Sequence, residues 1–131
     1  MFKNTKEKGA AGEEIACKYL VKNGFTILDR NYQKKWGELD IVANYKGILN
    51  FIEVKSVLGS IKDAKGDTDA GYRPEDNVHI RKQGRLRRVI QSYLQERGYS
   101  IETDFCFTIA IVVMDIKLRR AKVRLIENVV F

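Results

Sequence analysis

Apolar residues recur along this chain with two different spacings, which predict helices in two segments and strands in five. Helical spacing marks residues 6–23 and 79–97, and each segment is followed by a glycine, Gly24 or Gly98, of the kind that ends helices. Alternating or continuous β-branched and aromatic residues predict strands at 25–33, 37–44, 48–56, 105–114 and 122–130. This order predicts an α/β fold in a single domain spanning residues 1–131, in which the polar stretch 57–77 is a long loop.

The first predicted helix carries two adjacent glutamates that point in different directions. At 100° per residue its apolar face contains Ile15, Ala16, Tyr19 and Leu20. Gly9 and Gly12 lie on that same face, so the helix can approach its support closely. Glu13 lies at the edge of this face and is predicted to look toward the sheet, whereas Glu14 is predicted to be solvated.

Regular alternation also assigns faces to the strand at 25–33. It places Phe25, Ile27 and Asp29 on one face and Leu28 and Arg30 on the other.

The segment 37–56 is predicted to form a β-hairpin. Lys46-Gly47 is a two-residue turn signal, weaker than Asn-Gly, and such a turn makes Tyr45 face Ile48. A three-residue loop or a bulge would give a different register.

This register brings four charged residues to one face of the hairpin. Asp40 lies across from Glu53, and Glu38 lies across from Lys55. Directly opposed carboxylates repel each other, and buried carboxylates need a compensating cation or a proton. A lysine could be that cation, and so could Mg²⁺ or Mn²⁺, which binds one or two carboxylates together with water and phosphate oxygens. The simpler alternative is a structural salt bridge between Asp40 and Lys55, with Glu53 in solvent.

The second predicted helix is strongly basic. It carries Arg81, Lys82, Arg85, Arg87, Arg88 and Arg97. Arg81, Arg85 and Arg88 fall opposite the buried stripe, where they form either a phosphate-binding patch or a solvated face. Lys82 extends the buried side and is predicted to point toward the hairpin. The net charge of +7 is compatible with a nucleic acid as partner.

Other features narrow the class of protein. The two cysteines, Cys17 and Cys106, are far apart and belong to no zinc-binding pattern, so they are predicted to be buried and reduced. A single histidine, His79, argues against a catalytic triad. No signal-peptide core and no apolar run of membrane-spanning length is present, which predicts a cytoplasmic protein without a membrane partner. Trp36 is interpreted as a packing residue rather than a base-stacking platform.

Several blocks of residues together resemble the YraN family, an uncharacterised bacterial family placed in the PD-(D/E)xK nuclease superfamily and similar to archaeal Holliday-junction resolvases. The resemblance runs from about Gly9 to Phe131. Its blocks are Gly12-Glu13-x-x-Ala16, Arg30-Asn31, Gly37-Glu38-x-Asp40, Phe51-Ile52-Glu53-Val54-Lys55, Lys82 with Arg85-Leu86, Tyr93-Leu94, and Ile126-Glu127-Asn128 with Phe131.

The resemblance implies a restriction-endonuclease-like αβββαβ core, with a central mixed sheet flanked by helices. It implies that Asp40 and Glu53 bind Mg²⁺ or Mn²⁺, with the Val54 carbonyl as a further ligand. It also implies that Lys55 positions or activates the attacking water and that Glu13 is the helix glutamate of resolvase-like members. Two departures stand out: the motif's Pro-Asp is Leu39-Asp40 here, and Thr108 stands where many members carry an aspartate.

Three functions follow as hypotheses. The first is a metal-dependent endonuclease acting on DNA, including branched DNA, and by analogy with resolvases it works as a homodimer. The second is a nucleic-acid-binding module that keeps the fold without catalysis. The third is a structural partner protein whose hairpin charges form only salt bridges. Metal-dependent cleavage separates the first from the others.

Overall fold

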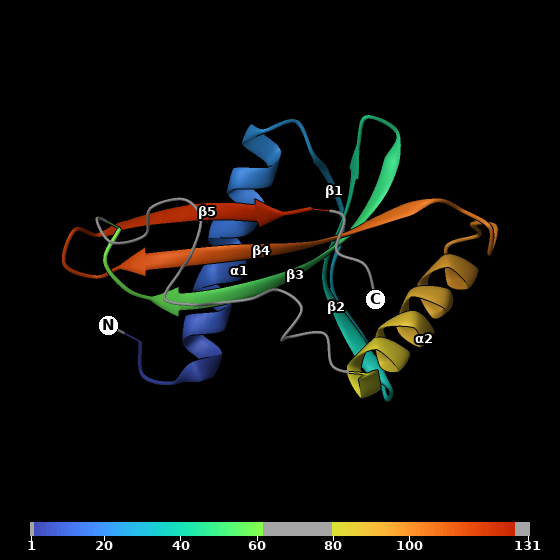
Figure 1. Cartoon of the computed structure of the whole chain (residues 1–131), viewed down its shortest axis with the longest axis horizontal. Coiled ribbons are helices and arrows are strands. Elements are labelled where there is room, and N and C mark those ends of the chain that lie inside the picture. The colour runs from blue at the N-terminus through green and yellow to red at the C-terminus, as the bar shows by residue number, and fades with distance from the viewer. Residues whose placement is uncertain (1, 62–79, 128–131) are drawn as a thin grey trace.

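The computed structural model describes residues 2–61 and 80–127, with side chains described for all of these except 80–83. The elements run in the order α1 (Thr5–Lys22), β1 (Thr26–Lys34), β2 (Gly37–Tyr45), β3 (Ile48–Leu58), α2 (Ile80–Glu96), β4 (Phe105–Asp115) and β5 (Arg120–Ile126) (Figure 1). The predicted α/β order is therefore confirmed. The predicted loop at 57–77 starts later than expected because β3 continues to Leu58, and its residues from 62 onward lie outside the described part, as does His79.

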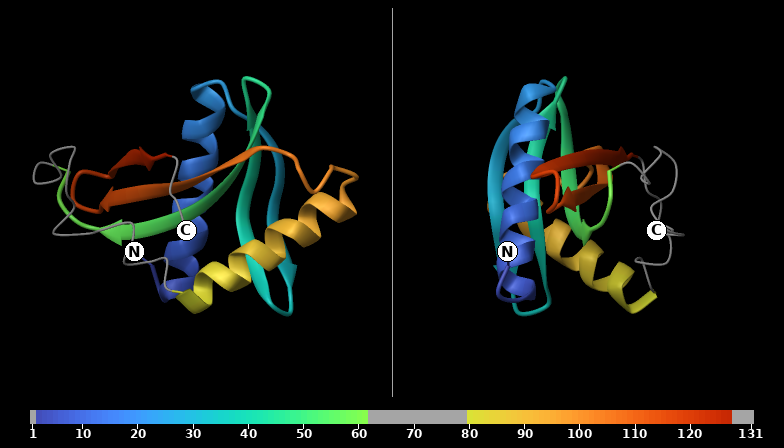
Figure 2. Two further views of the ribbon diagram at one scale, coloured as in Figure 1. Left: turned by 45° about the vertical axis from the view of Figure 1, so that its right-hand side comes forward. Right: turned by 90° about the vertical axis from the view of Figure 1, so that its left-hand side faces the viewer.

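The five strands form one mixed sheet in the order β1-β2-β3-β4-β5. Only β3 and β4 run parallel, and the other neighbours are antiparallel. The two helices pack on opposite faces: α1 residues share one apolar cluster with alternate strand positions, and α2 residues share the other (Figure 2). We refer to these two faces of the sheet as the α1 face and the α2 face. None of the helices within the described ranges is both long and apolar enough to cross a membrane.

Residues with known capping preferences stand at both ends of α1. The Asn4 side chain caps its first turn by accepting a hydrogen bond from the Glu7 N–H at 2.8 Å. At the other end Gly24 adopts φ +94°, a conformation that costs glycine little. Between these ends, Ala16 and Leu20 are fully buried against the sheet.

The close approach predicted for α1 occurs at one of its two glycines. A Cβ on Gly12 would lie 1.7 Å from Ser56 Oγ and 2.8 Å from Ser56 Cβ, on β3. A Cβ on Gly9 would meet nothing within 4 Å. Gly12 therefore sets the distance between α1 and the strand that carries Glu53 and Lys55.

A bulge in β1 corrects the predicted faces of that strand. The pairing with β2 shifts by one residue between Ile27 and Asp29, so Leu28 is the extra residue. Asp29 consequently lies on the α2 face, where its carboxylate accepts hydrogen bonds from Tyr93 Oη (2.6 Å) and Arg97 (3.2 Å). Arg30 lies on the α1 face. The regular alternation assumed from the sequence was wrong at Asp29 and Arg30, because one inserted residue reverses the faces of the side chains that follow it directly.

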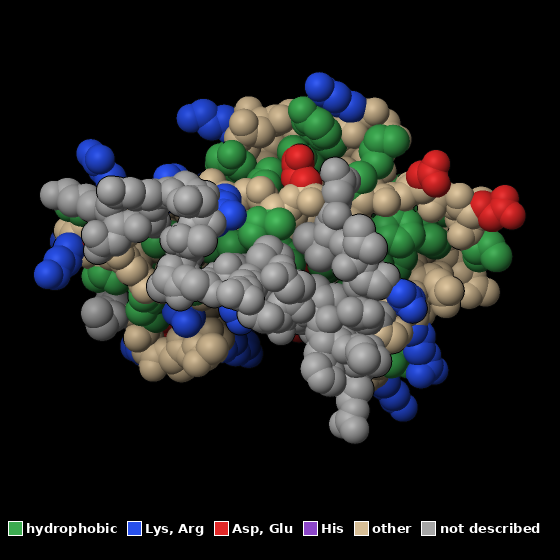
Figure 3. Space-filling view, in the orientation of Figure 1, with side chains coloured by type: hydrophobic (Ala, Val, Ile, Leu, Met, Phe, Trp, Pro, Cys, Tyr) green, Lys and Arg blue, Asp and Glu red, His purple; other side chains and the backbone are tan. Residues whose placement is uncertain are grey.

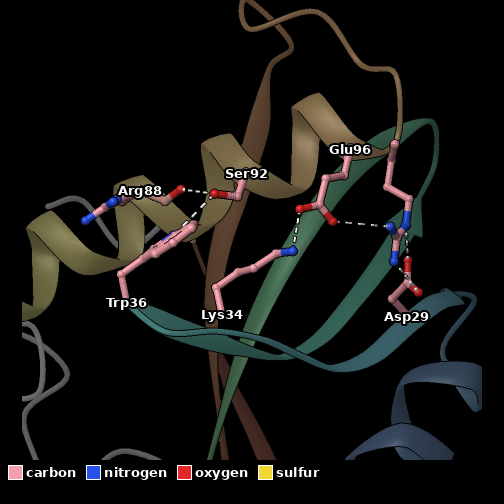
Figure 4. A network of polar contacts seen from close by, with 7 residues as sticks. Asp29, Lys34, Trp36, Arg88, Ser92 and Glu96 are labelled. Carbon is pink, nitrogen blue, oxygen red and sulfur yellow. Dashed lines mark hydrogen bonds and ion pairs between the residues drawn. The ribbon is translucent and has the colours of Figure 1, made fainter.

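Polar contacts join α2 to the β1–β2 hairpin (Figure 4). Lys34 pairs with Glu96, and the indole N–H of Trp36 donates to Ser92 Oγ at 3.2 Å. The Arg88 guanidinium lies over the Trp36 ring, 4.2 Å from its centroid. Trp36 packs against the core beside α2, as the sequence interpretation expected.

The turn of the β2–β3 hairpin matches its prediction. Lys46 and Gly47 both have positive φ, 52° and 83°, as a two-residue turn of the primed type requires. Tyr45 pairs with Ile48. At the C-terminal end, β5 starts at Arg120, two residues before the predicted strand, and ends at Ile126; residues 128–130 of that predicted strand lie outside the described part.

Candidate active site

The candidate site lies where β2 and β3 stop pairing. The predicted register holds for five pairs, from Tyr45 with Ile48 to Ile41 with Ile52. It ends one residue before the expected pair of Asp40 with Glu53, so that direct opposition was wrong. Asp40 instead turns its Oδ2 to accept a hydrogen bond from the Val54 N–H at 2.8 Å. At the point where the strands separate, the Asp40 carboxylate thus accepts the Val54 N–H in place of a backbone carbonyl of β2.

Burial gives Asp40 unusual acid–base behaviour. Desolvation raises the pKa of its carboxyl to about 6, against the lowering effect of the Val54 hydrogen bond. The negative charges of Glu53, Glu13 and Glu38 contribute to this raised pKa. Asp40 is therefore the centre of an acidic group in which added positive charge would be stabilising.

Glu53 and Lys55 follow the last paired position of β3 and point to the α2 face. This assignment follows from alternation, because Ile52 and Val54 belong to the α1-face cluster. Glu53 is half-buried, with one carboxylate oxygen out of contact with solvent, and Lys55 is exposed. Both residues line a cavity of about 650 Å³ together with Glu38, Asp40 and Val54. The cavity brings together the hairpin residues singled out from the sequence.

The glutamates of α1 take the two environments predicted from helical angle. The Glu13 side chain is 13% exposed, and the Glu14 side chain is 52% exposed. Arg30 bridges them, with N–O distances of 3.5 Å to Glu13 and 3.1 Å to Glu14. Glu13 does not line the cavity, although its charge acts on Asp40. The structure therefore places Glu13 beside the site and pairs it with Arg30, to which the sequence interpretation had given no role in the site.

The basic helix contributes to the site in a different way from that predicted. Arg85, expected on the outer face, borders the cavity beside the β1–β2 hairpin residues Lys34 and Lys35. Arg88 is held over Trp36. The side chains of Arg81 and Lys82 lie outside the described part. Arg85 could have been recognised from its angle, since it lies at the flank of the buried stripe rather than opposite it.

The donor atoms suit a hard divalent cation. Asp40 and Glu53 supply carboxylate oxygens, and Mg²⁺ characteristically binds one or two carboxylates while keeping several waters. In an extended strand the N–H and C=O of one residue point to the same side. The Val54 carbonyl therefore faces the same gap as its N–H, which binds Asp40. Within the described ranges, no three acidic, histidine or cysteine side chains gather into a metal-binding cluster, so such a site would rest on two carboxylates and a carbonyl.

The structural salt-bridge alternative is not what the structure contains. Of the ion pairs between described residues, none joins Asp40 to Lys55. Glu53 is half-buried rather than solvated. Thr108 is buried on β4 and pairs with Ile52, so a neutral side chain occupies that position. Cys17 is buried as predicted, whereas Cys106 is only half-buried; both are free thiols.

Comparison with known proteins gives the chain its family. A model described as "Uncharacterised protein family UPF0102" matches residues 12–116, which contain every candidate hairpin residue. A UPF0102 protein of Clostridium botulinum is 32% identical over 123 residues, covering 94% of this chain and 93% of the relative. A UPF0102 protein of Helicobacter pylori is 33% identical over 132 residues, covering 99% and 98%. One from Desulforamulus reducens is 43% identical over 90 residues, covering 68% and 66%. The chain belongs to the UPF0102 family, which is the YraN family that the residue blocks had indicated.

Proposed function

We propose that this chain is a metal-dependent endonuclease that hydrolyses DNA phosphodiester bonds, with branched DNA among its substrates. One observation supports the proposal above the others. Asp40 is half-buried at the end of the β2–β3 pairing, and it shares a cavity with Glu53, Val54 and Lys55. A partly buried carboxylate surrounded by other carboxylates is costly without a cation, and it is suited to holding one.

The proposed chemistry assigns a role to each of these groups. Asp40, Glu53 and the Val54 carbonyl would hold Mg²⁺ or Mn²⁺, which when bound supplies a Lewis acid and lowers the pKa of water. The Lys55 ammonium donates hydrogen bonds to the attacking water and orients it toward the phosphorus. It also adds positive charge where the transition state gains negative charge. Arg85, with Lys34 and Lys35, presents positive charge to the rest of the phosphate backbone.

The proposal extends to the superfamily and to the assembly. The α-β-β-β-α-β order, with carboxylates on adjacent strands and a lysine two residues after the second, matches the PD-(D/E)xK pattern that the residues resemble. Cutting both strands of a duplex calls for two sites, so a homodimer is part of the proposal. We place the protein in the cytoplasm, where its two free cysteines would stay reduced.

A non-catalytic DNA-binding module is the alternative that the same basic rim supports. Phosphate contacts by Arg85 and its neighbouring lysines need no metal. Metal-dependent cleavage distinguishes the two functions, because a protein that only binds DNA leaves it intact.

Nicking of supercoiled plasmid and of a four-way junction tests the proposal. We expect wild-type protein to nick at least one of these with Mg²⁺ or Mn²⁺ and neither with EDTA. Lys55→Ala should lower the rate by at least about 100-fold, because a charge that acts in the transition state is lost. Lys55 is exposed, so the variant should fold normally. Gel separation of nicked from intact DNA measures the rate.

Lys46→Ala is the matched control for this test. Lys46 is an exposed lysine of the same hairpin, located at the turn and outside the cavity. It should nick at the wild-type rate. Equal rates for Lys55→Ala and wild type would contradict the proposed role of Lys55, and DNA binding without any metal-dependent nicking would establish the binding module instead.

A further inference from the structure

The edge strand β5 carries an alternating pattern of basic and apolar residues. Arg120, Lys122 and Arg124 alternate with Ala121, Val123 and Leu125. Val123 and Leu125 pack into the α1-face cluster. Because successive side chains of a strand point to opposite faces, the three basic residues share the α2 face. We refer to Arg120, Lys122 and Arg124 as the β5 row.

The strand pairing aligns the β5 row with the candidate site. Lys55 pairs with Ile111 on β4, and Ile111 pairs with Arg124 on β5. Residues paired in this way point to the same face of a sheet, so Arg124 lies on the same face as Lys55, two strands away. Neighbouring strands are about 4.8 Å apart, which puts the two backbones roughly 10 Å from each other.

We propose that the β5 row binds phosphates of the DNA strand whose scissile phosphate lies at the Asp40–Glu53 site. This inference rests on the proposed function. It adds a second contact surface, which lies on the α2 face at the β5 edge of the sheet. No part of this row lines the cavity.

The spacing of the β5 row fits a phosphate backbone. Alternate residues of a strand are about 6.8 Å apart, and each DNA strand carries one charge per 3.4 Å of helix rise. Adjacent basic residues of the row therefore match every second phosphate along the axis. Arg120 and Lys122 are exposed, and Arg124 is half-buried. In the space-filling view, Lys and Arg side chains project around the joined ends of β4 and β5 (Figure 3).

The turn that precedes the row is firmly held. Asp115, which pairs with Arg120, accepts hydrogen bonds from the Leu118 N–H (3.0 Å) and the Ile61 N–H (3.1 Å). These bonds lower the pKa of the Asp115 carboxyl, so it is ionised at neutral pH. The β4–β5 hairpin can therefore present its basic residues with little ordering cost on binding.

Charge on an edge strand has a second known use. Lysines there prevent strands of different molecules from pairing edge to edge. This alternative makes a different prediction, because neutralising the row would then cause self-association and leave DNA affinity unchanged. The experiment below measures both properties.

The test is DNA binding as a function of salt. Binding of a fluorescein-labelled 30-base-pair duplex is followed by anisotropy between 50 and 200 mM NaCl in Ca²⁺, with a gel to verify that the DNA stays intact. Each lost phosphate contact reduces the slope of log K against log salt by about 0.9. The triple variant Arg120→Gln/Lys122→Gln/Arg124→Gln should therefore lose about 2 to 3 units of slope, equally for duplexes of different sequence.

Two variants control this measurement. Lys6→Gln/Lys18→Gln/Lys22→Gln removes the same charge from exposed positions of α1, on the opposite side of the sheet, and should keep the wild-type slope. Arg120→Lys/Lys122→Arg/Arg124→Lys keeps the charge of the row and should bind like wild type. Because Arg124 is half-buried, Lys122→Gln alone is the fallback if the triple variant unfolds, with an expected loss of about one unit.

Each result decides the inference. Equal losses of salt slope in the β5 and α1 variants would overturn it, because they would show that only the net charge of the protein matters. Self-association with unchanged affinity, seen by size-exclusion chromatography, would overturn it in favour of edge protection. Wild-type protein that binds no DNA would overturn both the row and the proposed function. Wild-type protein that binds through the row yet never nicks DNA would support the row and contradict only the endonuclease.

Discussion

Replacing Asp40 by asparagine is expected to abolish nicking and at the same time to stabilise the metal-free protein at neutral pH. A neutral amide is a poor ligand for Mg²⁺, so the rate should fall by about 1,000-fold or more, equivalent to several kcal/mol of transition-state stabilisation. The amide keeps an oxygen that can accept the Val54 N–H. The variant should therefore preserve the local structure while removing the charge.

The stability gain follows from the raised pKa. Folding lifts the pKa of the Asp40 carboxyl from 3.8 to about 6, so the folded state holds this proton more tightly. The resulting stabilisation is complete below pH 3.8 and is lost as pH rises to 6. Above pH 6 the wild type carries the full cost of a half-buried charge, at most about 3 kcal/mol for a pKa raised from 3.8 to about 6. Asp40→Asn avoids that cost.

Urea unfolding of EDTA-treated protein at pH 4 and pH 7.5 measures the effect. We expect the variant to be more stable by about 1–3 kcal/mol at pH 7.5 and nearly equal to wild type at pH 4. Saturating Mn²⁺ should stabilise only the wild type. Asp104→Asn, at an exposed carboxylate, should change neither property. A variant that nicks normally, or that is no more stable at pH 7.5, would contradict this account of Asp40.

Gly12→Val should strongly destabilise the protein. Its Cβ would overlap the Ser56 side chain, with Ser56 Cβ only 2.8 Å away, so the helix or β3 must shift. Overpacking of this kind costs typically 1–3 kcal/mol, and we expect about 3 kcal/mol because β3 is a central strand. The displaced strand carries Glu53 and Lys55, so nicking should fall as well. Urea unfolding and the plasmid assay measure the two losses.

A second glycine and a second substitution test the cause. Gly9→Val lies on the same helix but meets nothing within 4 Å, so it should change stability by only a few tenths of a kcal/mol. Ser56→Gly removes both atoms that approach Gly12 and should restore part of the stability of Gly12→Val. Equal destabilisation at Gly9 and Gly12 would show that glycine is needed for the helix itself rather than for the contact with β3.

The hairpin shows how much local chemistry can predict. A two-residue turn fixes a register, and that register is correct for every pair from Tyr45–Ile48 to Ile41–Ile52. The sequence gives no sign of where pairing stops, because Asp40 competes for the Val54 N–H through a side-chain contact. The predicted proximity of Asp40, Glu53 and Lys55 is confirmed, since one cavity contains all three, while their direct opposition is not.

Helical angle was a better guide than strand alternation. It separated Glu13 from Glu14, because a regular helix keeps its period over many residues. Strand alternation failed at Asp29 and Arg30, since a single bulged residue is invisible in the apolar pattern. The sequence interpretation did not single out the β5 row, and its predicted strand start at residue 122 left Arg120 outside the strand.

Because of the bulge at Leu28, β1 forms ion pairs on both faces of the sheet and so links the two helical layers. Consecutive residues of this edge strand form ion pairs on opposite faces of the sheet. Asp29 pairs with Arg97, directly after α2, and Arg30 pairs with the glutamates of α1. Deleting Leu28 would exchange their faces and set an aspartate against two glutamates and an arginine against Arg97. A chain that lacks only this neutral residue would have the same net charge, but both ion-pair contacts would become contacts between like charges that repel.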